Sequence, residues 1–228
     1  MLHPFPAPAP VTVPIVGSDQ HFPVHRIYCV GKNYAAHIKE MGARPGRDAV
    51  CFFLKPNDAI VLDGRVPYPP GTNNLHYEGE LVMAIGKGGR NIAPAEALDH
   101  VFGYALGLDM TRRDLQTAAG QVGHPWDTGK AFDYSAPLSP ITPVAQCGHF
   151  ASGRLQLTVN GQVRQDADFS DLLWKTQEIV SELSRLFLLQ PGDLIFTGTP
   201  AGVGPVVPGD RIVLSIDRLG ELHAVITA

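Results

Sequence analysis

Residues 75–85 read Leu-His-Tyr-Glu-Gly-Glu-Leu-Val-Met-Ala-Ile, and the fold is expected to be organised around this stretch. Glu78 and Glu80 are two positions apart, and an apolar run over residues 81–85 follows them. The pattern predicts a β-strand with an acidic front end and a buried tail. Residues i and i+2 of a strand share a face, with about 6.5–7 Å between their Cβ atoms. Two carboxylates held that close repel each other, and a divalent cation between them would remove the repulsion.

A third acid strengthens this interpretation, because an isolated Glu-x-Glu pair is more commonly the exposed edge of a strand. Residues 103–108 form another short apolar run, and Asp109 follows at its C-terminal end. Acids at the polar ends of two apolar strands favour a site over a plain surface. Glu78, Glu80 and Asp109 are therefore the predicted ligands of one divalent ion, Mg²⁺ or Mn²⁺.

The composition is that of an ordinary globular protein. The chain has 228 residues, of which 44% are hydrophobic and 18% charged, and its net charge is −4. Without a basic run, nucleic acid and anionic membranes are not expected as partners. No apolar stretch is long enough for a membrane span, and no secretory signal is visible. Three scattered cysteines suit a reducing cytoplasm and predict no disulfide framework.

The rest of the chain predicts many short elements. Residues 1–20 form a proline-rich leader, whose valines either add an edge strand or lie loosely on the surface, and residues 21–228 are expected to be one catalytic domain. The predicted helices cover residues 35–41, 94–102, 111–119 and 170–188 (with Ser170 as the cap), and residues 125–133 read as an ordered loop. The predicted strands cover residues 24–30, 50–54 (a buried strand), 57–62 and 194–197, with hairpins over 155–163 and 211–226.

The first short helix carries a second candidate group. His37 and Glu40 are spaced i, i+3, so their side chains meet on one helical face. A carboxylate beside an imidazole fixes its tautomer and makes a usable general base, although a surface ion pair has the same spacing. The glycines and proline of residues 42–46 suggest a mobile segment that would bring this dyad over a metal when substrate binds.

Two loops could contact an anionic ligand. Lys130 lies among glycine and aromatic residues, where its ammonium either points at an anion or extends to water. The glycine-rich residues 198–204 lack the lysine of a phosphate-binding loop and precede no helix, which argues against nucleotide binding. Their backbone N–H groups remain able to bind a carboxylate.

Several motifs in order resemble the fumarylacetoacetate hydrolase family. They are GKNYAAHIKEMG, FFLKP, HYEGEL, GLDMTRRDLQ, WDTGKAFD and FTGTPAGVG, and the similarity extends from about residue 24 to 226. The resemblance implies an α+β, β-rich fold of layered mixed sheets in a roll, usually in a homodimer. It places Glu78, Glu80 and Asp109 on the metal ligands and His37 with Glu40 on the catalytic dyad. It places Lys130, Arg113, Gln116 and Thr199 on positions that line the substrate site.

The resemblance is strongest to members that hydrolyse the C–C bond of a 2,4-dioxo acid, fumarylpyruvate of gentisate catabolism above all. Oxaloacetate decarboxylation, isomerisation of a related dioxo acid, or binding of a metal or metabolite without catalysis are the alternatives. A fumaryl group carries a second carboxylate, and its cationic partner is open among Arg112, Arg113, His124 and Lys32.

Overall fold

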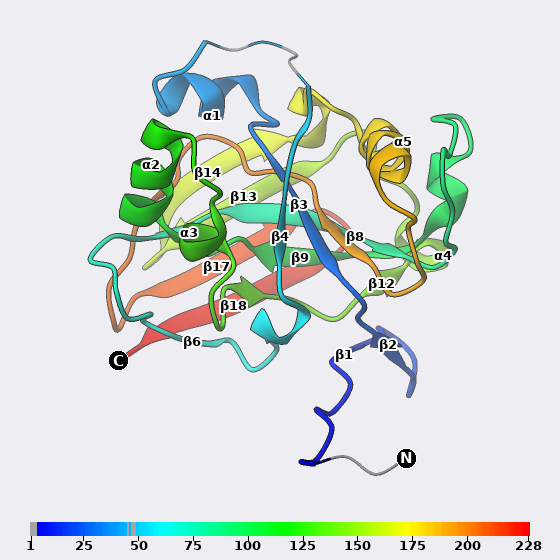
Figure 1. Ribbon diagram of the computed structural model, residues 1–228, viewed down its shortest axis with the longest axis horizontal. Helices are drawn as coiled ribbons and strands as arrows, with labels where there is room; N and C mark the ends of the chain where they lie inside the picture. Colours follow the sequence, from blue (N-terminus) through cyan, green and yellow to red (C-terminus); the bar gives the residue numbers. More distant parts are fainter. Residues whose placement is uncertain (1–3, 45, 47–48) are drawn as a thin grey trace.

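A computed structural model describes residues 4–44, 46 and 49–228, and strands predominate in it (Figure 1). The predicted acidic strand, β8, lies inside the larger sheet. The strands of this sheet are, in order across it, β12 (Thr142–Pro143), β9 (Val101–Leu108), β8 (Gly79–Ile85), β15 (Leu194–Phe196), β3 (Ile27–Gly31) and β4 (Cys51–Lys55). β8 pairs antiparallel with β9 on one side and with β15 on the other, and all its residues are buried.

A second sheet lies behind the first in Figure 1. Its strands are, in order, β14 (Gln162–Asp168), β13 (Arg154–Val159), β17 (Arg211–Ile216), β18 (Gly220–Thr227) and β6 (Arg65–Pro67). β13 contacts β8, and β17 and β18 contact β9, so the two sheets pack face to face. This layered, β-rich α+β architecture confirms the predicted fold class.

Alternate residues of β8 point into two different cores, as the strand period requires. Leu81, Met83 and Ile85 join a large core shared with β13 and β17 of the second sheet. Val82 and Ala84 face a smaller core on the other side. Because both faces are covered, the strand is apolar throughout, and only its front end carries charge.

The remaining elements surround these sheets. The small sheets contain β10 (Thr111–Arg112), β7 (Leu75–Tyr77) and β16 (Gly204–Pro205), then β1 (Thr12–Pro14) with β2 (His21–Pro23), and β5 (Ile60–Val61) with β11 (Ala136–Pro137). The helices are α1 (Ala35–Glu40), α2 (Arg113–Val122), α3 (Asp127–Lys130), α4 (Val144–Cys147) and α5 (Thr176–Leu186), with 3₁₀ turns η1 (Asn57–Ala59), η2 (Ala97–His100) and η3 (Phe169–Asp171). α1, α2 and α3 gather on one side of the molecule, at the upper left of Figure 1.

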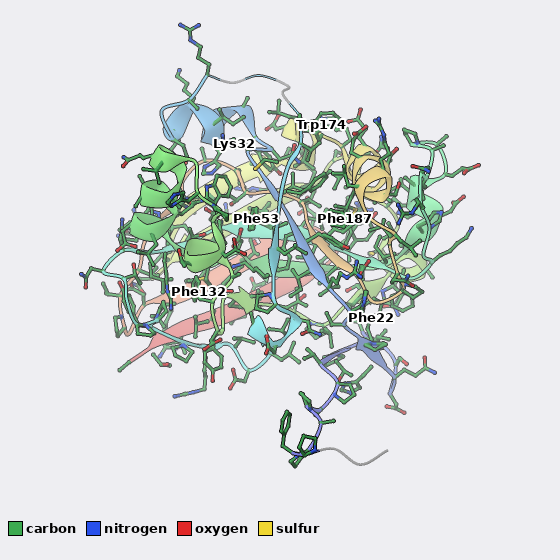
Figure 2. The ribbon with its side chains drawn as sticks, viewed as in Figure 1. Phe22, Lys32, Phe53, Phe132, Trp174 and Phe187 are labelled. Carbon is green, nitrogen blue, oxygen red and sulfur yellow. The ribbon has the colours of Figure 1, made fainter. Side chains whose placement is uncertain are left out.

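Part of the proline-rich leader is a strand, the first of the two alternatives for it. β1 pairs antiparallel with β2, and Val13 is fully buried in the smaller core. Phe22 of β2 stacks on Phe102 of β9 with ring centroids 5.6 Å apart, where the N-terminal ribbon meets the main body (Figure 2). The role of residues 21–228 as one catalytic domain stays a prediction.

Two predicted helices are wrong in extent. The helix expected over residues 94–102 is only the turn η2, because Val101 and Phe102 belong to β9, where Val101 pairs with Ile85. The helix expected over 170–188 begins only at Thr176. Asp168 accepts a hydrogen bond from Ser170 N at 2.7 Å and holds that segment in η3 instead.

Other short segments differ in the same way. Residues 57–59 form η1 before the two-residue β5, so the strand expected over 57–62 is mostly absent. The helix expected from Thr111 begins at Arg113, because Thr111 and Arg112 pair with β7. The expected loop at 125–133 contains α3. The β4 strand is only partly buried, with Leu54 45% exposed.

Candidate active site

Three acidic side chains meet at the open end of the β8–β9 pair. β7 ends at Tyr77 and β8 begins at Gly79, so Glu78 lies at a break between two strands, which the single expected strand did not include. Asp109 N donates to the Glu78 carbonyl at 2.8 Å and places the two acids opposite each other. One carboxylate oxygen from each of Glu78, Glu80 and Asp109 lies within 4.8 Å of the others. All three side chains are buried, with residue exposures of 4%, 1% and 0%.

Cations neutralise two of the three acids. Lys130 Nζ lies 2.7 Å from Glu78 Oε2 and 2.7 Å from Asp109 Oδ2. Arg113 donates to the other oxygen of Glu78. Lys55, at the end of β4, lies with its Nζ 2.8 Å from Asp109 Oδ1. Lys130 therefore points at carboxylates of the protein itself and does not extend to water.

Glu80 is different, because no cation within the described residues pairs with it. Its Oε2 accepts one hydrogen bond, from Gly198 N at 2.7 Å. Burial and the neighbouring Asp109 and Glu78 carboxylates raise the pKa of Glu80 well above its usual value. Burial acts in the same direction on Glu78, but Lys130 and Arg113 outweigh it and lower the pKa of that carboxyl. The cluster is thus short of positive charge on the Glu80 side.

The donor set fits a divalent cation. Carboxylate oxygens are the ligands that Mg²⁺ and Mn²⁺ prefer. Asp109 Oδ1 is buried and makes no hydrogen bond with any described residue, despite its closeness to Lys55. A buried carboxylate that no described cation pairs with, as Glu80 is, is expected of a ligand arranged for an ion.

The predicted dyad is formed in the structure. Nδ1 of His37 lies 3.0 Å from Glu40 Oε2, and Glu40 Oε1 accepts from Gly202 N at 2.9 Å. With a carboxylate on Nδ1, the imidazole carries its proton there and presents Nε2 as the free basic nitrogen. His37 is only 8% exposed whereas Glu40 is exposed, so the pair is half-buried, with the imidazole on its inner side.

The glycine-rich loop has the carboxylate-binding role that its sequence suggested, but toward the protein's own acids. Its N–H groups at Gly198 and Gly202 hold Glu80 and Glu40. Gly202 has φ +99°, and a Cβ there would lie 1.9 Å from the Arg164 carbonyl oxygen, so the close approach requires glycine. The loop therefore positions both candidate groups at once.

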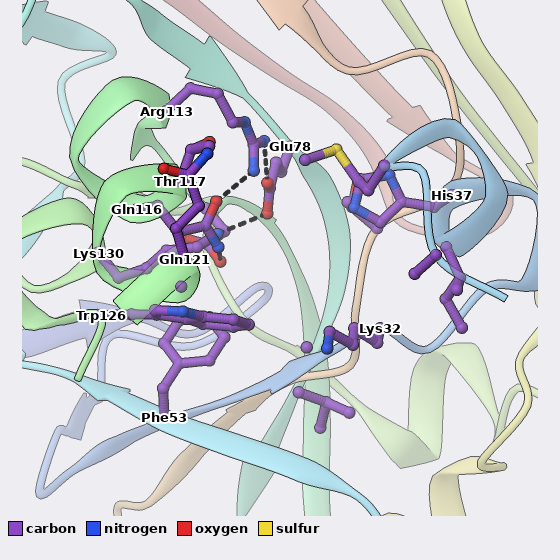
Figure 3. Close-up of a pocket in the computed structure, with 18 residues that line it drawn as sticks. Lys32, His37, Phe53, Glu78, Arg113, Gln116, Thr117, Gln121, Trp126 and Lys130 are labelled. Carbon is purple, nitrogen blue, oxygen red and sulfur yellow. Dashed lines mark hydrogen bonds and ion pairs between the residues drawn. The ribbon is translucent and has the colours of Figure 1, made fainter. Parts of the chain in front are cut away.

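A cavity of about 320 Å³ joins these groups. Arg113, Gln116 and Thr117 of α2 line one wall, and His37 lies across from them, with Glu78 between (Figure 3). Phe53 and Trp126 form a third side, with ring centroids 5.8 Å apart. Each of the nine predicted site residues except Glu80 and Glu40 lines the cavity; those that line it are His37, Glu78, Asp109, Arg113, Gln116, Lys130 and Thr199.

The polar groups expected to contact substrate are already ordered by one another. Arg113 donates to Gln116 Oε1 and to Glu78, which leaves the Gln116 amide N–H₂ as a donor for other groups. Thr199 Oγ1 donates to the Gly79 carbonyl at 3.0 Å and accepts from Gln165 Nε2 at 2.8 Å. Their contacts with substrate stay predictions.

Sequence reasoning missed two residues of this network. Lys55 is 2% exposed, and its Nζ donates to the carbonyls of Met110 and Lys130. A lysine closing an apolar strand just before a proline was the available signal. Gln165, fully buried, accepts from Gly79 N at 2.9 Å. Gln165 lies in the polar strand β14, and nothing in the local sequence pattern indicates that its side chain is buried at the site.

The predicted mobile segment lies between α1 and β4. Residues 45, 47 and 48 are outside the described residues, so closure over the cavity stays a prediction. Met41 and Ala43, which precede them, line the cavity. No helix of the described residues has both the length and the apolar composition needed to cross a bilayer.

Comparison with known proteins agrees with this geometry. A model of the fumarylacetoacetate (FAA) hydrolase C-terminal family matches residues 26–227. The chain is 46% identical over 172 residues to a fumarylpyruvate hydrolase of Ralstonia sp, covering 75% of this chain and 89% of the relative. It is 43% identical over 198 residues to the mitochondrial oxaloacetate tautomerase FAHD1 of Mus musculus, covering 86% and 89%.

A solved structure is similar over nearly the whole chain. The crystal structure of fumarylpyruvate hydrolase from Pseudomonas aeruginosa in complex with Mn²⁺ and pyruvate matches with a TM-score of 0.96 and 52% identity, and the match covers 99% of each chain. The range that the family model matches, residues 26–227, includes the carboxylate cluster and the dyad. The chain therefore belongs to the fumarylacetoacetate hydrolase family.

Proposed function

We propose that the protein is an enzyme that hydrolyses the C–C bond of an acylpyruvate, with fumarylpyruvate as substrate and fumarate and pyruvate as products. The observation that carries this proposal is the cavity that joins a buried carboxylate cluster to a His–Glu dyad. The named activity of the Ralstonia and Pseudomonas relatives supports it. A divalent ion, Mn²⁺ or Mg²⁺, held by Glu78, Glu80 and Asp109 would bind the oxo-acid oxygens and stabilise the charge of the departing pyruvate.

The dyad supplies the base. His37 Nε2, with Nδ1–H held by Glu40, takes a proton from a water whose oxygen attacks the C4 carbonyl. The C3–C4 bond then breaks, and its electron pair goes to C3. C4 becomes a carboxylate of fumarate, and C3 takes up a proton to give the methyl group of pyruvate. Water, substrate and products balance without an oxidant or a second substrate.

The cations on the α2 side stabilise negative charge that develops at the substrate. Lys130 is 2% exposed, and burial lowers its pKa less than the Asp109 and Glu78 carboxylates raise it, so its ammonium stays charged. Its three N–H groups already donate to Glu78, Asp109 and Thr111, so Lys130 acts on the substrate through its charge. The Gln116 amide provides a donor that is fixed before the reaction begins. Arg113 keeps Gln116 and Glu78 in place through its two hydrogen bonds.

The second candidate is keto–enol tautomerisation of oxaloacetate, which a relative of 43% identity is named for. That reaction needs proton transfer at C3 but no attacking water. Purified protein with Mn²⁺ is tested on fumarylpyruvate, acetylpyruvate and oxaloacetate, with products followed by proton NMR. Release of pyruvate and fumarate supports hydrolysis, and loss of enol oxaloacetate alone supports the tautomerase.

The same preparation tests the family's homodimer, which we also propose for this chain. Sedimentation equilibrium gives its mass in solution, against 24.5 kDa for one chain.

Loss of product formation in Glu80→Ala, together with a retained fold by circular dichroism, separates the metal site from a structural role.

A further inference from the structure

Lys32 differs from the other charged groups that line the cavity. Besides Lys32, the charged or ionisable side chains that line the cavity are His37, Glu78, Asp109, Arg113 and Lys130. His37 pairs with Glu40, and Arg113 and Lys130 pair with the buried acids. Within the part of the chain that the structure describes, Lys32 has neither a hydrogen bond nor an ion pair. Among the described residues, Lys32 is therefore a cation without a partner at a site where the other charges are held by neighbours.

The other cations considered for this role are engaged or lie elsewhere. The Arg112 guanidinium carbon lies 4.5 Å from the centroid of the Phe132 ring, away from the cavity. His124 lines neighbouring cavities with Pro125 and Asp127. Arg113 is committed to Glu78 and Gln116. Of the four cations, Lys32 therefore remains the candidate for a contact with the second carboxylate of the substrate.

The backbone fixes where the Lys32 side chain starts. Its φ is +59°, a conformation that few residues other than glycine adopt. The next residue, Asn33, is fully buried and donates to the Thr197 carbonyl at 2.7 Å and to the Trp174 carbonyl at 3.0 Å. An anchored residue after a left-handed one keeps the Lys32 Cα in place, and such conformations cluster at ligand sites.

The direction of the side chain agrees with a contact at the mouth of the cavity. The Lys32 amine is directed toward Trp126, into the space between the α2 wall and His37 (Figure 3). A Cβ on the preceding Gly31 would lie 3.2 Å from the Trp126 ring, so this part of the chain runs beside the ring. Lys32 is exposed, whereas the three acids are buried at the floor.

The two ends of the cavity therefore differ in chemistry. An acylpyruvate bound at the floor through its oxo-acid end extends its acyl group toward the mouth. We propose that Lys32 binds the second carboxylate of a dicarboxylic acyl group and so selects fumarylpyruvate over acylpyruvates with a neutral acyl end. This inference deepens the proposed function and rests on it.

The test compares two charge-removing variants with one matched control. Lys32→Met keeps the length of the side chain, and Lys32→Gly suits the positive φ, so neither is expected to unfold the protein. Lys39→Met removes an exposed lysine of α1 that does not line the cavity. For each protein with Mn²⁺, kcat/KM is measured on fumarylpyruvate and acetylpyruvate.

We expect the ratio of the two kcat/KM values to fall at least about tenfold in both Lys32 variants, since one charge-assisted contact is lost. The ratio in Lys39→Met is expected to equal that of the wild type. A wild type without preference for fumarylpyruvate, or Lys32 variants that keep the preference, would overturn the inference while leaving the hydrolase intact.

Binding gives a second readout that does not need turnover. Calorimetry on the Mn²⁺-loaded protein compares fumarate with crotonate, which has a methyl group in place of one carboxylate. Selective loss of fumarate affinity in the Lys32 variants supports the contact, and equal loss for both acids refutes it. If the wild type hydrolyses neither acylpyruvate, the proposed function fails, and the binding ratio alone still decides the role of Lys32.

Discussion

Removing one charge from each of two neighbouring glutamates is expected to have opposite effects on the metal-free protein. Glu80→Gln removes a buried charge that no described cation balances, and the glutamine oxygen can still accept from Gly198 N. Glu78→Gln removes the shared partner of Lys130 and Arg113. Both variants change the side chain by one atom type and keep its shape.

The magnitudes follow from burial and pairing. Relief of an uncompensated buried charge raises the free energy of unfolding by about 1–3 kcal/mol, or roughly 2–12 °C in Tm for a chain of this size. Breaking a buried ion pair lowers it by about 3–5 kcal/mol, or roughly 6–20 °C. The two metal-free variants are therefore expected on opposite sides of the wild type.

The effect of Glu80→Gln has a defined pH dependence. Burial and the neighbouring carboxylates raise the folded-state pKa of Glu80 above the ordinary glutamate value of 4.5. A raised pKa means that the contribution of Glu80 to stability is fully present below the unfolded pKa and is lost as the pH rises through the folded pKa. The advantage of Glu80→Gln over the wild type is thus absent below about pH 4.5 and grows as the pH increases.

Thermal unfolding in chelator and in Mn²⁺ provides the assay. At a free ion concentration of 100 Kd the wild type gains about 2.7 kcal/mol, or roughly 5–11 °C. Both variants are expected to lose most of this gain, so the stability advantage of Glu80→Gln over the wild type in chelator shrinks by most of about 2.7 kcal/mol when Mn²⁺ is added. A Glu80→Gln protein that is destabilised in chelator as much as Glu78→Gln, or that keeps the wild-type response to Mn²⁺, would refute this account of the charges.

Three further substitutions test the dyad, the loop and α2. His37→Ala is expected to lower kcat by about 10²–10⁴ with Mn²⁺ affinity retained by calorimetry; wild-type turnover would mean that water is activated elsewhere. Gly202→Ala places a Cβ 1.9 Å from the Arg164 oxygen, so we expect a loss of at least about 2 kcal/mol in stability and a fall in kcat. Gly209→Ala, with φ +98° and open space around it, is the control and should cost only about 1 kcal/mol in the same denaturant titration. Burial raises the pKa of Asp114, but hydrogen bonds from Thr72, Asn73 N and Leu115 N outweigh it and lower that pKa below the ordinary aspartate value of 3.8. The stabilising effect of Asp114 is therefore present above pH 3.8 and is lost as the pH falls. Asp114→Asn should therefore destabilise by about 0.5–1.5 kcal/mol at neutral pH and by less in acid; an equal effect at both pH values would contradict the hydrogen-bond assignment.

The meeting of the three carboxylates was predictable because it depends on local pattern. Glu78 and Glu80 begin one apolar strand and Asp109 ends another, and antiparallel pairing of β8 with β9 brings these ends together. The i, i+3 spacing of His37 and Glu40 likewise needs only a helical turn. In both cases the spacing along a single strand or helix determines which side chains lie close together.

The partners of these groups were not predictable in the same way. Lys55 reaches Asp109 from a different strand, and Gln165 reaches Gly79 across the two sheets. Such contacts depend on how distant segments pack, which hydrophobic periodicity does not encode. The prediction of short elements failed for a related reason, because α3 has only four residues, too few to show a helical period.

The bonds from residues 198–202 to the acids have a consequence for how the chain folds. Gly198 is 118 residues from Glu80, and Gly202 is 162 residues from Glu40. By contrast, the β8–β9 pair that joins Glu78 to Asp109 closes a much shorter loop, which costs less entropy and forms earlier. On the ribosome the three acids can therefore meet while the last part of the chain is still being synthesised. Glu80 and the dyad are held in place only after residues 198 and 202 have emerged, so a chain truncated before this loop is expected to lack both the complete carboxylate cluster and the positioned base.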